Sequence, residues 1–131
     1  ESYAKTIGIE AATASRIGRT MILPAAMKAQ GQAASLVGRT REALGDVPDA
    51  EAGFLGRLTS LTAGFMQSLD ALDEQRALMD GTSGALACAR AARDGVLPAM
   101  QECRRLADLL ESAVDARDWP LPSYAELMWT H

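Results

Sequence analysis

ARAARDGVLPAMQECRRLADLLESA, residues 89–113, decides the fold of this chain. Apolar and small residues recur in it at alternating steps of three and four, the spacing of one face of an α-helix. This face consists of Ala89, Ala92, Val96, Ala99, Cys103, Leu106, Leu110 and Ala113. Such a seam is typical of helices that pack in antiparallel bundles with short connections. We therefore expect a helix over about residues 83–116, capped by Thr82 or Ser83.

The preceding segment predicts a second helix of similar length, over about residues 48–80. Pro48 and Asp49 are favourable at the start of a helix, and Gly81 is a suitable residue to end it. The apolar stripe in steps of three and four runs through Phe54, Leu58, Leu61, Phe65, Leu69, Leu72, Arg76 and Met79. This stripe predicts a second surface that faces the same core.

A first helix is expected over about residues 2–44, ended by Gly45 with Asp46 and Pro48 following closely. One of its faces carries Ile7, Ala11, Ala14, Ile17, Met21 and Ala25. Pro24 interrupts the run, and a proline inside a helix removes a backbone hydrogen bond and bends the axis. The helix therefore either kinks at Pro24 or divides into two elements there.

Two short segments of the chain echo one another. The sequence Ile-Leu-Pro-Ala at residues 22–25 is matched by Val-Leu-Pro-Ala at residues 96–99. The match is too short to indicate duplication. Pro24 and Pro98 are better explained as kinks at which two packed helices bend together, and a conformational switch is the alternative.

The composition favours a single all-α domain. The chain has 131 residues, few aromatic residues (5%) and an abundance of alanine, which is the strongest helix former. We expect an antiparallel bundle of three long helices, or four if the first divides at Pro24, with a short C-terminal docking helix. Because the chain opens on Glu1 and is helix-like at once, we interpret it as a C-terminal fragment of a longer protein. No apolar run is long enough to span a membrane and no signal peptide is recognisable, which predicts a cytoplasmic protein without membrane contact.

Charge is distributed unevenly around a net value of −4. Residues 1–45 hold six basic and three acidic residues, whereas the remainder holds seven basic and fourteen acidic residues. The basic residues are spaced along one helix rather than clustered, which argues against a nucleic-acid partner. We expect the basic first helix to pack beside the acidic ones.

Residues that carry chemistry are missing from this segment. His131 is the only histidine and lies at the terminus, so histidine-based catalysis and a di-iron centre lack their residues. No glycine-rich phosphate loop is present either. Cys88 and Cys103 lie fifteen positions apart, roughly 22 Å along one helix, so they are expected to be free thiols rather than a disulfide or a zinc site. We expect no catalytic, cofactor-binding or metal-binding residue here, and the segment alone is not an enzyme.

The last fifteen residues differ from the helices before them. Trp119, Pro120 and Pro122 predict an extended, rigid peptide. Ser123 and Glu126 have the spacing of a capping box that starts a short helix. This helix presents Tyr124, Leu127, Met128 and Trp129 to a docking surface. The surface is either the core of this domain or an external partner.

Four segments together resemble a known family. They are Tyr3-Ala-Lys5 with Ile9-Glu10-Ala11, Arg19-Thr-Met-Ile-Leu-Pro-Ala25, Val96-Leu-Pro-Ala-Met100, and Trp119-Pro-Leu-Pro-Ser-Tyr124-Ala-Glu-Leu-Met128. In this order and separation they resemble the C-terminal helical region of type III glutamine synthetases, which closes with Trp-Pro-x-Pro-x-Tyr-x-Asp/Glu-Leu-Leu. The middle helix matches only in its leucine spacing. Met128 and Trp129 stand where the family has Leu and Phe, apolar residues of similar volume.

The resemblance implies a parent enzyme that ligates ammonia to glutamate with ATP and a divalent metal such as Mg²⁺, through a γ-glutamyl phosphate. The catalytic residues and cofactors would belong to an upstream domain. What carries over is a structural and docking role for Pro24, Pro98, Trp119, Pro120, Pro122, Tyr124 and Trp129. The expected partners are the parent's catalytic domain and neighbouring subunits of a homo-oligomer. The alternatives are a free-standing helical interaction or sensor module and a helical ligand-binding domain.

Overall fold

The computed structural model describes residues 2–114 and 118–121, and these residues form helices joined by turns and short irregular segments. The elements are α1 (Ser2–Ile17), η1 (Gly18–Ile22), α2 (Leu23–Leu44), α3 (Asp49–Asp80), α4 (Ala85–Ala91), η2 (Ala92–Val96) and α5 (Leu97–Glu111). The two η elements are single π-helical turns that join α1 to α2 and α4 to α5 without a break. The expected all-α bundle of long helices is therefore confirmed.

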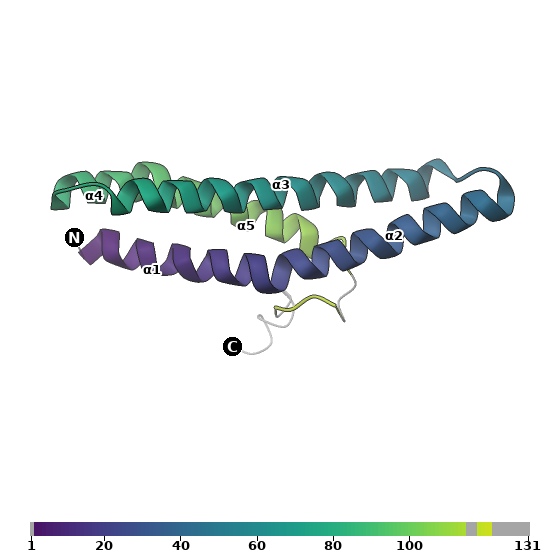
Figure 1. Ribbon diagram of the computed structural model, residues 1–131, viewed down its shortest axis with the longest axis horizontal. Helices are drawn as coiled ribbons and strands as arrows, with labels where there is room; N and C mark the ends of the chain where they lie inside the picture. The colour runs from purple at the N-terminus through teal and green to yellow at the C-terminus, as the bar shows by residue number, and fades with distance from the viewer. Residues whose placement is uncertain (1, 115–117, 122–131) are drawn as a thin grey trace.

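The chain forms three helical runs: α1–η1–α2, α3 and α4–η2–α5. The first and the third pack against α3, which extends along the whole molecule (Figure 1). One side of α3 contacts α1 and α2, and another contacts α4 and α5. The N-terminus lies at the same end as α4, whereas the loop between α2 and α3 lies at the opposite end. Because α5 stops well short of that loop, the α2–α3 end of the molecule consists of only two helices (Figure 1).

The main core lies where all three runs meet. At its centre, Phe65, Leu69 and Leu72 of α3 are at most 1% exposed. Its other buried members are Ala4, Ile7, Ala11, Ile22, Ala26, Met79, Ala92, Val96, Cys103, Leu106 and Leu110. Burying each large side chain stabilises the fold by about 1.5–3 kcal/mol. No residue between Ala26 and Phe65 is a buried member of this core, so the two-helix end is packed separately.

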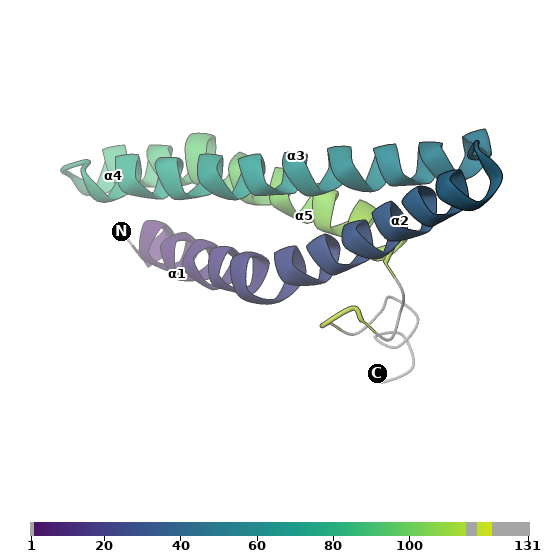
Figure 2. The same cartoon turned by 45° about the vertical axis from the view of Figure 1, so that its right-hand side comes forward.

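The π-turn η1 shifts the buried face of the first helical run. Met21 was expected to face the core, but it is 41% exposed, whereas Ile22 is only 5% exposed. A π-turn contains more residues than an α-helical turn and so moves the apolar stripe along by one position. Figure 2 shows the run bending between α1 and α2, where this turn lies. The run thus remains continuous through Pro24 rather than dividing there.

Glycines mark both connections between helical runs. Gly45 follows α2 with φ +81°, a left-handed conformation that glycine adopts at low cost, and its N–H donates to the carbonyl of Arg41. The predicted cap of α4 was wrong, because Gly84 with φ +94° precedes this helix and no side chain caps it. Thr82 instead donates its hydroxyl hydrogen to the carbonyl of Leu78 at the end of α3.

The last helix ends earlier than the expected residue 116. After Glu111, the N–H groups of Ala113 and Val114 both donate to the carbonyl of Leu110, which forms a turn instead of continuing the helix. The hydroxyl of Ser112 donates to the carbonyl of Leu109 at 2.7 Å. Such local side-chain hydrogen bonds compete with helix continuation.

Candidate functional site

Both Leu-Pro segments follow a π-turn. Leu23 donates its N–H to the carbonyl of Gly18, and Leu97 donates to the carbonyl of Ala92, so each bond spans five residues rather than four. A proline has no N–H, and its ring collides with the carbonyl four residues earlier in a regular helix. The wider turn directly before Pro24 and Pro98 relieves this collision. The repeated Leu-Pro segment therefore reflects the same backbone arrangement, a π-turn before a proline, at two places in the chain.

The two π-turns also make close contacts with α3. A Cβ atom at Gly18 would lie 2.7 Å from Cδ2 of Leu69 and 3.2 Å from Cζ of Phe65. A Cβ atom at Gly95 would collide with Oε1 of Gln75. Glycine is thus required by packing at η1, where both neighbouring side chains are buried in the core.

A polar cluster ties η1 and α1 to α3 beside this contact. Arg19 donates to Oδ2 of Asp73 from Nε at 3.2 Å and from Nη2 at 2.8 Å, and Nη2 also reaches Oδ1 of Asp70 at 2.8 Å. The other oxygen of Asp73 accepts from the hydroxyl of Ser15 at 2.8 Å and from Nη1 of Arg76 at 3.1 Å. Ser15 is only 5% exposed. Asp73 is therefore the hub of the cluster.

The surroundings of Asp73 favour its charged form. Burial alone raises the pKa of this carboxyl group, but the hydrogen bonds from Ser15, Arg19 and Arg76 outweigh burial and hold the pKa below its usual value. Two arginines and two aspartates also balance one another in charge. The cluster is therefore satisfied internally and fits a structural role that joins the basic first run to the acidic α3.

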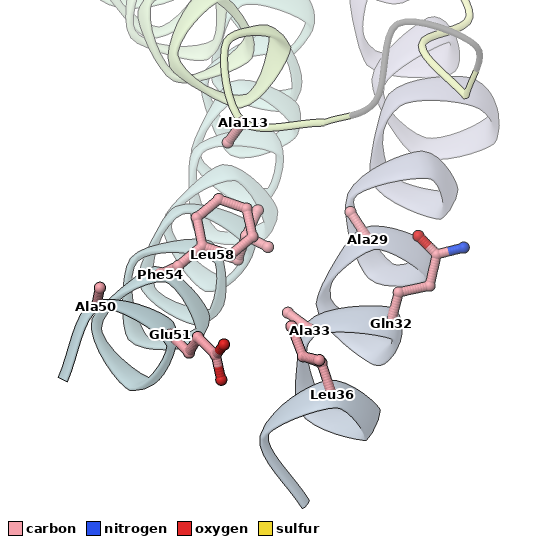
Figure 3. Close-up of a pocket in the computed structure, with 9 residues that line it drawn as sticks. All are labelled: Ala29, Gln32, Ala33, Leu36, Ala50, Glu51, Phe54, Leu58 and Ala113. Atoms are coloured by element: carbon pink, nitrogen blue, oxygen red, sulfur yellow. The ribbon is translucent and has the colours of Figure 1, made fainter. Parts of the chain in front are cut away.

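An apolar groove of about 480 Å³ lies between α2 and α3, beyond the end of α5 (Figure 3). It is lined by Ala29, Gln32, Ala33, Leu36, Ala50, Glu51, Phe54, Leu58 and Ala113. Figure 3 shows Phe54 and Leu58 on α3 facing α2, with Ala113 at one end of the groove. Leu36 on the opposite wall is 52% exposed. The seam of α5 that covers α3 in the main bundle has no counterpart here.

Glu51 lines the groove, and Arg57 lies next to it on the ring of Phe54. Figure 3 shows the carboxylate of Glu51 directed into the space between the two helices, and its Oε2 atom is buried without a hydrogen-bond partner among the described residues. The guanidinium carbon of Arg57 lies 5.7 Å from the centre of the Phe54 ring, in a cation–π contact. Burying a carboxylate oxygen without a hydrogen-bond donor costs free energy, so a donor placed at Glu51 would stabilise this site.

The two cysteines are free thiols, as expected. Cys103 is buried and lies 3.2 Å from the carbonyl oxygen of Ser68, and burial raises the pKa of its thiol. Cys88 is half-buried and contacts the carbonyl oxygen of Thr82 at 3.2 Å. A protonated, buried thiol is a poor nucleophile, so Cys103 fits a packing role.

Four of the predicted docking residues lie in the described part of the chain: Pro24, Pro98, Trp119 and Pro120. Pro24 and Pro98 are exposed at the helix starts after the π-turns. Trp119 and Leu121 are half-buried and pack against the main core, while Asp118 accepts a hydrogen bond from Nζ of Lys28 at 2.8 Å.

The start of the tail therefore docks on this chain itself, and the neighbouring Pro120 is half-buried. The predicted roles of Pro122, Tyr124 and Trp129, and of the expected capping box, lie outside the described residues.

Neither a metal centre nor a membrane span is found in the described part of the chain. No group of three or more His, Cys, Asp or Glu side chains is placed to hold a metal ion within residues 2–114 and 118–121. Across the same residues, every helix is too short or too polar to cross a bilayer.

No protein-family model, no curated protein and no solved structure matches this chain.

Proposed function

We propose that this chain is the C-terminal structural and assembly domain of a type III glutamine synthetase. The parent enzyme would join ammonia to glutamate with ATP and Mg²⁺, and its catalytic residues would lie in another domain. The observation that carries this proposal is the ordered set of motifs at residues 19–25, 96–100 and 119–128. The assignment to cytoplasmic nitrogen metabolism follows from it.

The positions of these motifs support a scaffold role. Pro24 and Pro98 each follow a π-turn that contacts α3, and Trp119 packs on the core that those contacts enclose. The residues that carry the resemblance thus act through backbone geometry and packing. Residues of this kind suit a domain with a structural role.

The test uses the natural gene product that contains this segment. ATP-dependent glutamine formation and assembly size are measured for that protein and for the same protein stopped before Glu1. We expect activity in the intact protein and loss of assembly after truncation. Absence of glutamine formation by the intact protein would contradict the family assignment.

A point substitution separates assembly from chemistry. Trp119→Ala removes a large side chain from the main core and should weaken assembly or heat resistance. The rate per intact active site should stay close to that of the unsubstituted enzyme. Normal assembly and heat resistance in this variant would remove the scaffold role.

A second candidate function is a free-standing helical interaction module, and the groove between α2 and α3 favours it. An apolar groove with an unpaired carboxylate suits a protein partner as well as an enzyme subunit. The coding sequence upstream of Glu1 discriminates the two functions. A catalytic domain there supports the synthetase, whereas its absence supports the module.

A further inference from the structure

We propose that the groove between α2 and α3 binds the same groove on a second copy of this chain. We call residues 29–58 the arm, and the proposal is that two arms pack antiparallel as a two-fold symmetric four-helix unit. A second copy of the chain would then be the partner in the assembly role proposed above. The biological meaning of this pairing rests on the proposed function, but the pairing itself can be measured on the chain alone.

Within residues 2–114 and 118–121, the arm has no third helix. In the main bundle α5 covers α3, but α5 ends at Glu111, and of the described residues after it Ala113 alone lines the groove. The buried residues of the arm are not members of the main core. Two helices alone leave an apolar face open to water, and Leu36 is 52% exposed on that face. A helical surface from a second molecule would cover this apolar face.

The charges of the groove specify what that surface must carry. The buried Oε2 atom of Glu51 has no hydrogen-bond partner in the described part of the chain, so a matching surface would supply a donor. Arg57 is an exposed cation held on the ring of Phe54, at the centre of the α3 wall. A matching surface therefore offers an aromatic or aliphatic centre, a cation for Glu51 and an anion for Arg57. The arm of a second copy offers all three.

The spacing of these residues is self-complementary. Glu51 and Arg57 lie three positions on either side of Phe54. A two-fold axis that passes between two α3 helices at the level of Phe54 makes them antiparallel and brings Glu51 of each copy level with Arg57 of the other. The long arginine side chain can span the remaining offset between the flanks. Reciprocal contacts of this kind are what an isologous dimer interface requires.

The antiparallel arrangement also avoids a collision. With opposite arm directions, the two α5 helices lie on opposite sides of the two-fold axis, so they do not compete for one position. Parallel arms would place both α5 helices on the same face at the same level. The position of α5 beside only part of α3 thus selects the antiparallel pairing (Figure 1).

The experiment is sedimentation equilibrium of the 131-residue chain from low to high micromolar concentration. We expect a reversible monomer–dimer equilibrium. Leu36→Asp, which places a charge on the exposed wall, should weaken the dimer about 100-fold or more. The matched control is Leu86→Asp on α4, at the opposite end of the molecule, where Leu86 is 66% exposed. The control should leave the dimer unchanged, and circular dichroism verifies folding of both variants.

A charge exchange tests the register. Glu51→Arg and Arg57→Glu should each weaken the dimer about tenfold or more, because each brings like charges together. The double variant should recover most of the lost affinity. Single variants without effect, or a double variant as weak as either single one, would overturn the proposal.

Other occupants of the groove give different results. A chain that is monomeric at every concentration overturns the proposal and leaves the groove to a different protein. A full chain that is monomeric while residues 1–121 dimerise also overturns it, because residues 122–131 then cover the groove. Dimerisation without glutamine formation by the parent protein refutes the proposed function and leaves this inference intact.

Discussion

The main bundle and the arm are built from the same kind of helix but use their small residues differently. In the bundle, Gly18 touches Leu69 and Phe65 so closely that a Cβ atom would overlap them. In the arm, a Cβ atom at Gly31, Gly38, Gly53 or Gly56 would meet nothing within 4 Å. Glycine inside a helix costs about 1 kcal/mol relative to alanine. Internal packing accounts for that cost in the bundle but not in the arm.

The polar groups show the same contrast. Asp73 in the bundle accepts hydrogen bonds from three side chains, whereas Glu51 in the arm has a buried oxygen without a partner among the described residues. The charged hub of the bundle is therefore satisfied, although the buried hydroxyl of Thr62 there also has no partner among the described residues. The arm has the features of a surface that another molecule completes.

The largest difference is expected between two phenylalanines of α3. Phe65→Ala opens a cavity in a site that is 1% exposed and should destabilise the chain by about 3–5 kcal/mol. Phe54→Ala removes a partly buried ring from the groove and should cost about 1 kcal/mol in the monomer. Urea denaturation at a concentration where the chain is monomeric measures both. Equal losses would show that the arm is as well packed as the bundle.

A pair of glycine substitutions should change stability in opposite directions. Gly18→Ala places a methyl group against two buried side chains and should destabilise the chain by about 1–3 kcal/mol. Gly31→Ala places the same group in open space and should stabilise the helix by about 0.5–1 kcal/mol. Thermal melting of both variants checks this. A destabilising Gly31→Ala would show that a neighbouring group contacts Gly31 closely in solution.

Two carboxylates provide a smaller contrast. Asp73→Asn breaks a charged hub and should cost about 1 kcal/mol, a value reduced for screening because the side chain is 36% exposed. Glu51→Gln removes a carboxylate whose buried Oε2 atom has no partner among the described residues, and it should leave monomer stability unchanged or slightly higher. Denaturation at neutral pH compares the two variants. A large loss on Glu51→Gln would indicate a donor for this carboxylate within the monomer.

The Asp73 effect should depend on pH. Because folding lowers the pKa of Asp73, its contribution to stability is present above the unfolded value of about 3.9 and is lost as the pH falls through the lower folded value. The stability difference between the unsubstituted chain and Asp73→Asn should therefore shrink in acid. Asp94→Asn is the control, since Asp94 forms an exposed pair with Arg93 and should have no measurable effect. A difference that is independent of pH would contradict this account.

Periodicity predicted the fold well where burial within the chain decides it. The stripe from Phe65 to Met79 and the seam from Ala92 to Leu110 face the core as expected. Met21 was misplaced because hydrophobic spacing does not reveal that a π-turn precedes Pro24. The repeated Leu-Pro motif carried this signal, since a proline inside a helix must be accommodated by some change in the preceding turn.

The groove was not predicted, for a related reason. Phe54 and Leu58 continue the stripe of α3, and the sequence gives no sign that α5 stops before reaching them. Helix ends are the least reliable part of a pattern, and here Glu111 rather than residue 116 ends α5. The unpaired Oε2 atom of Glu51 depends on three-dimensional packing and has no sequence signal.

The central claim is that the bundle is complete in itself and that a second chain completes the arm. Hydrogen exchange measured at low and at high protein concentration tests it most directly. We expect the amides of residues 29–58 to exchange faster than those of the bundle in the dilute chain and to become protected as concentration rises. The amides around Phe65 and Val96 should not change. Exchange of the arm that is independent of concentration would contradict the account.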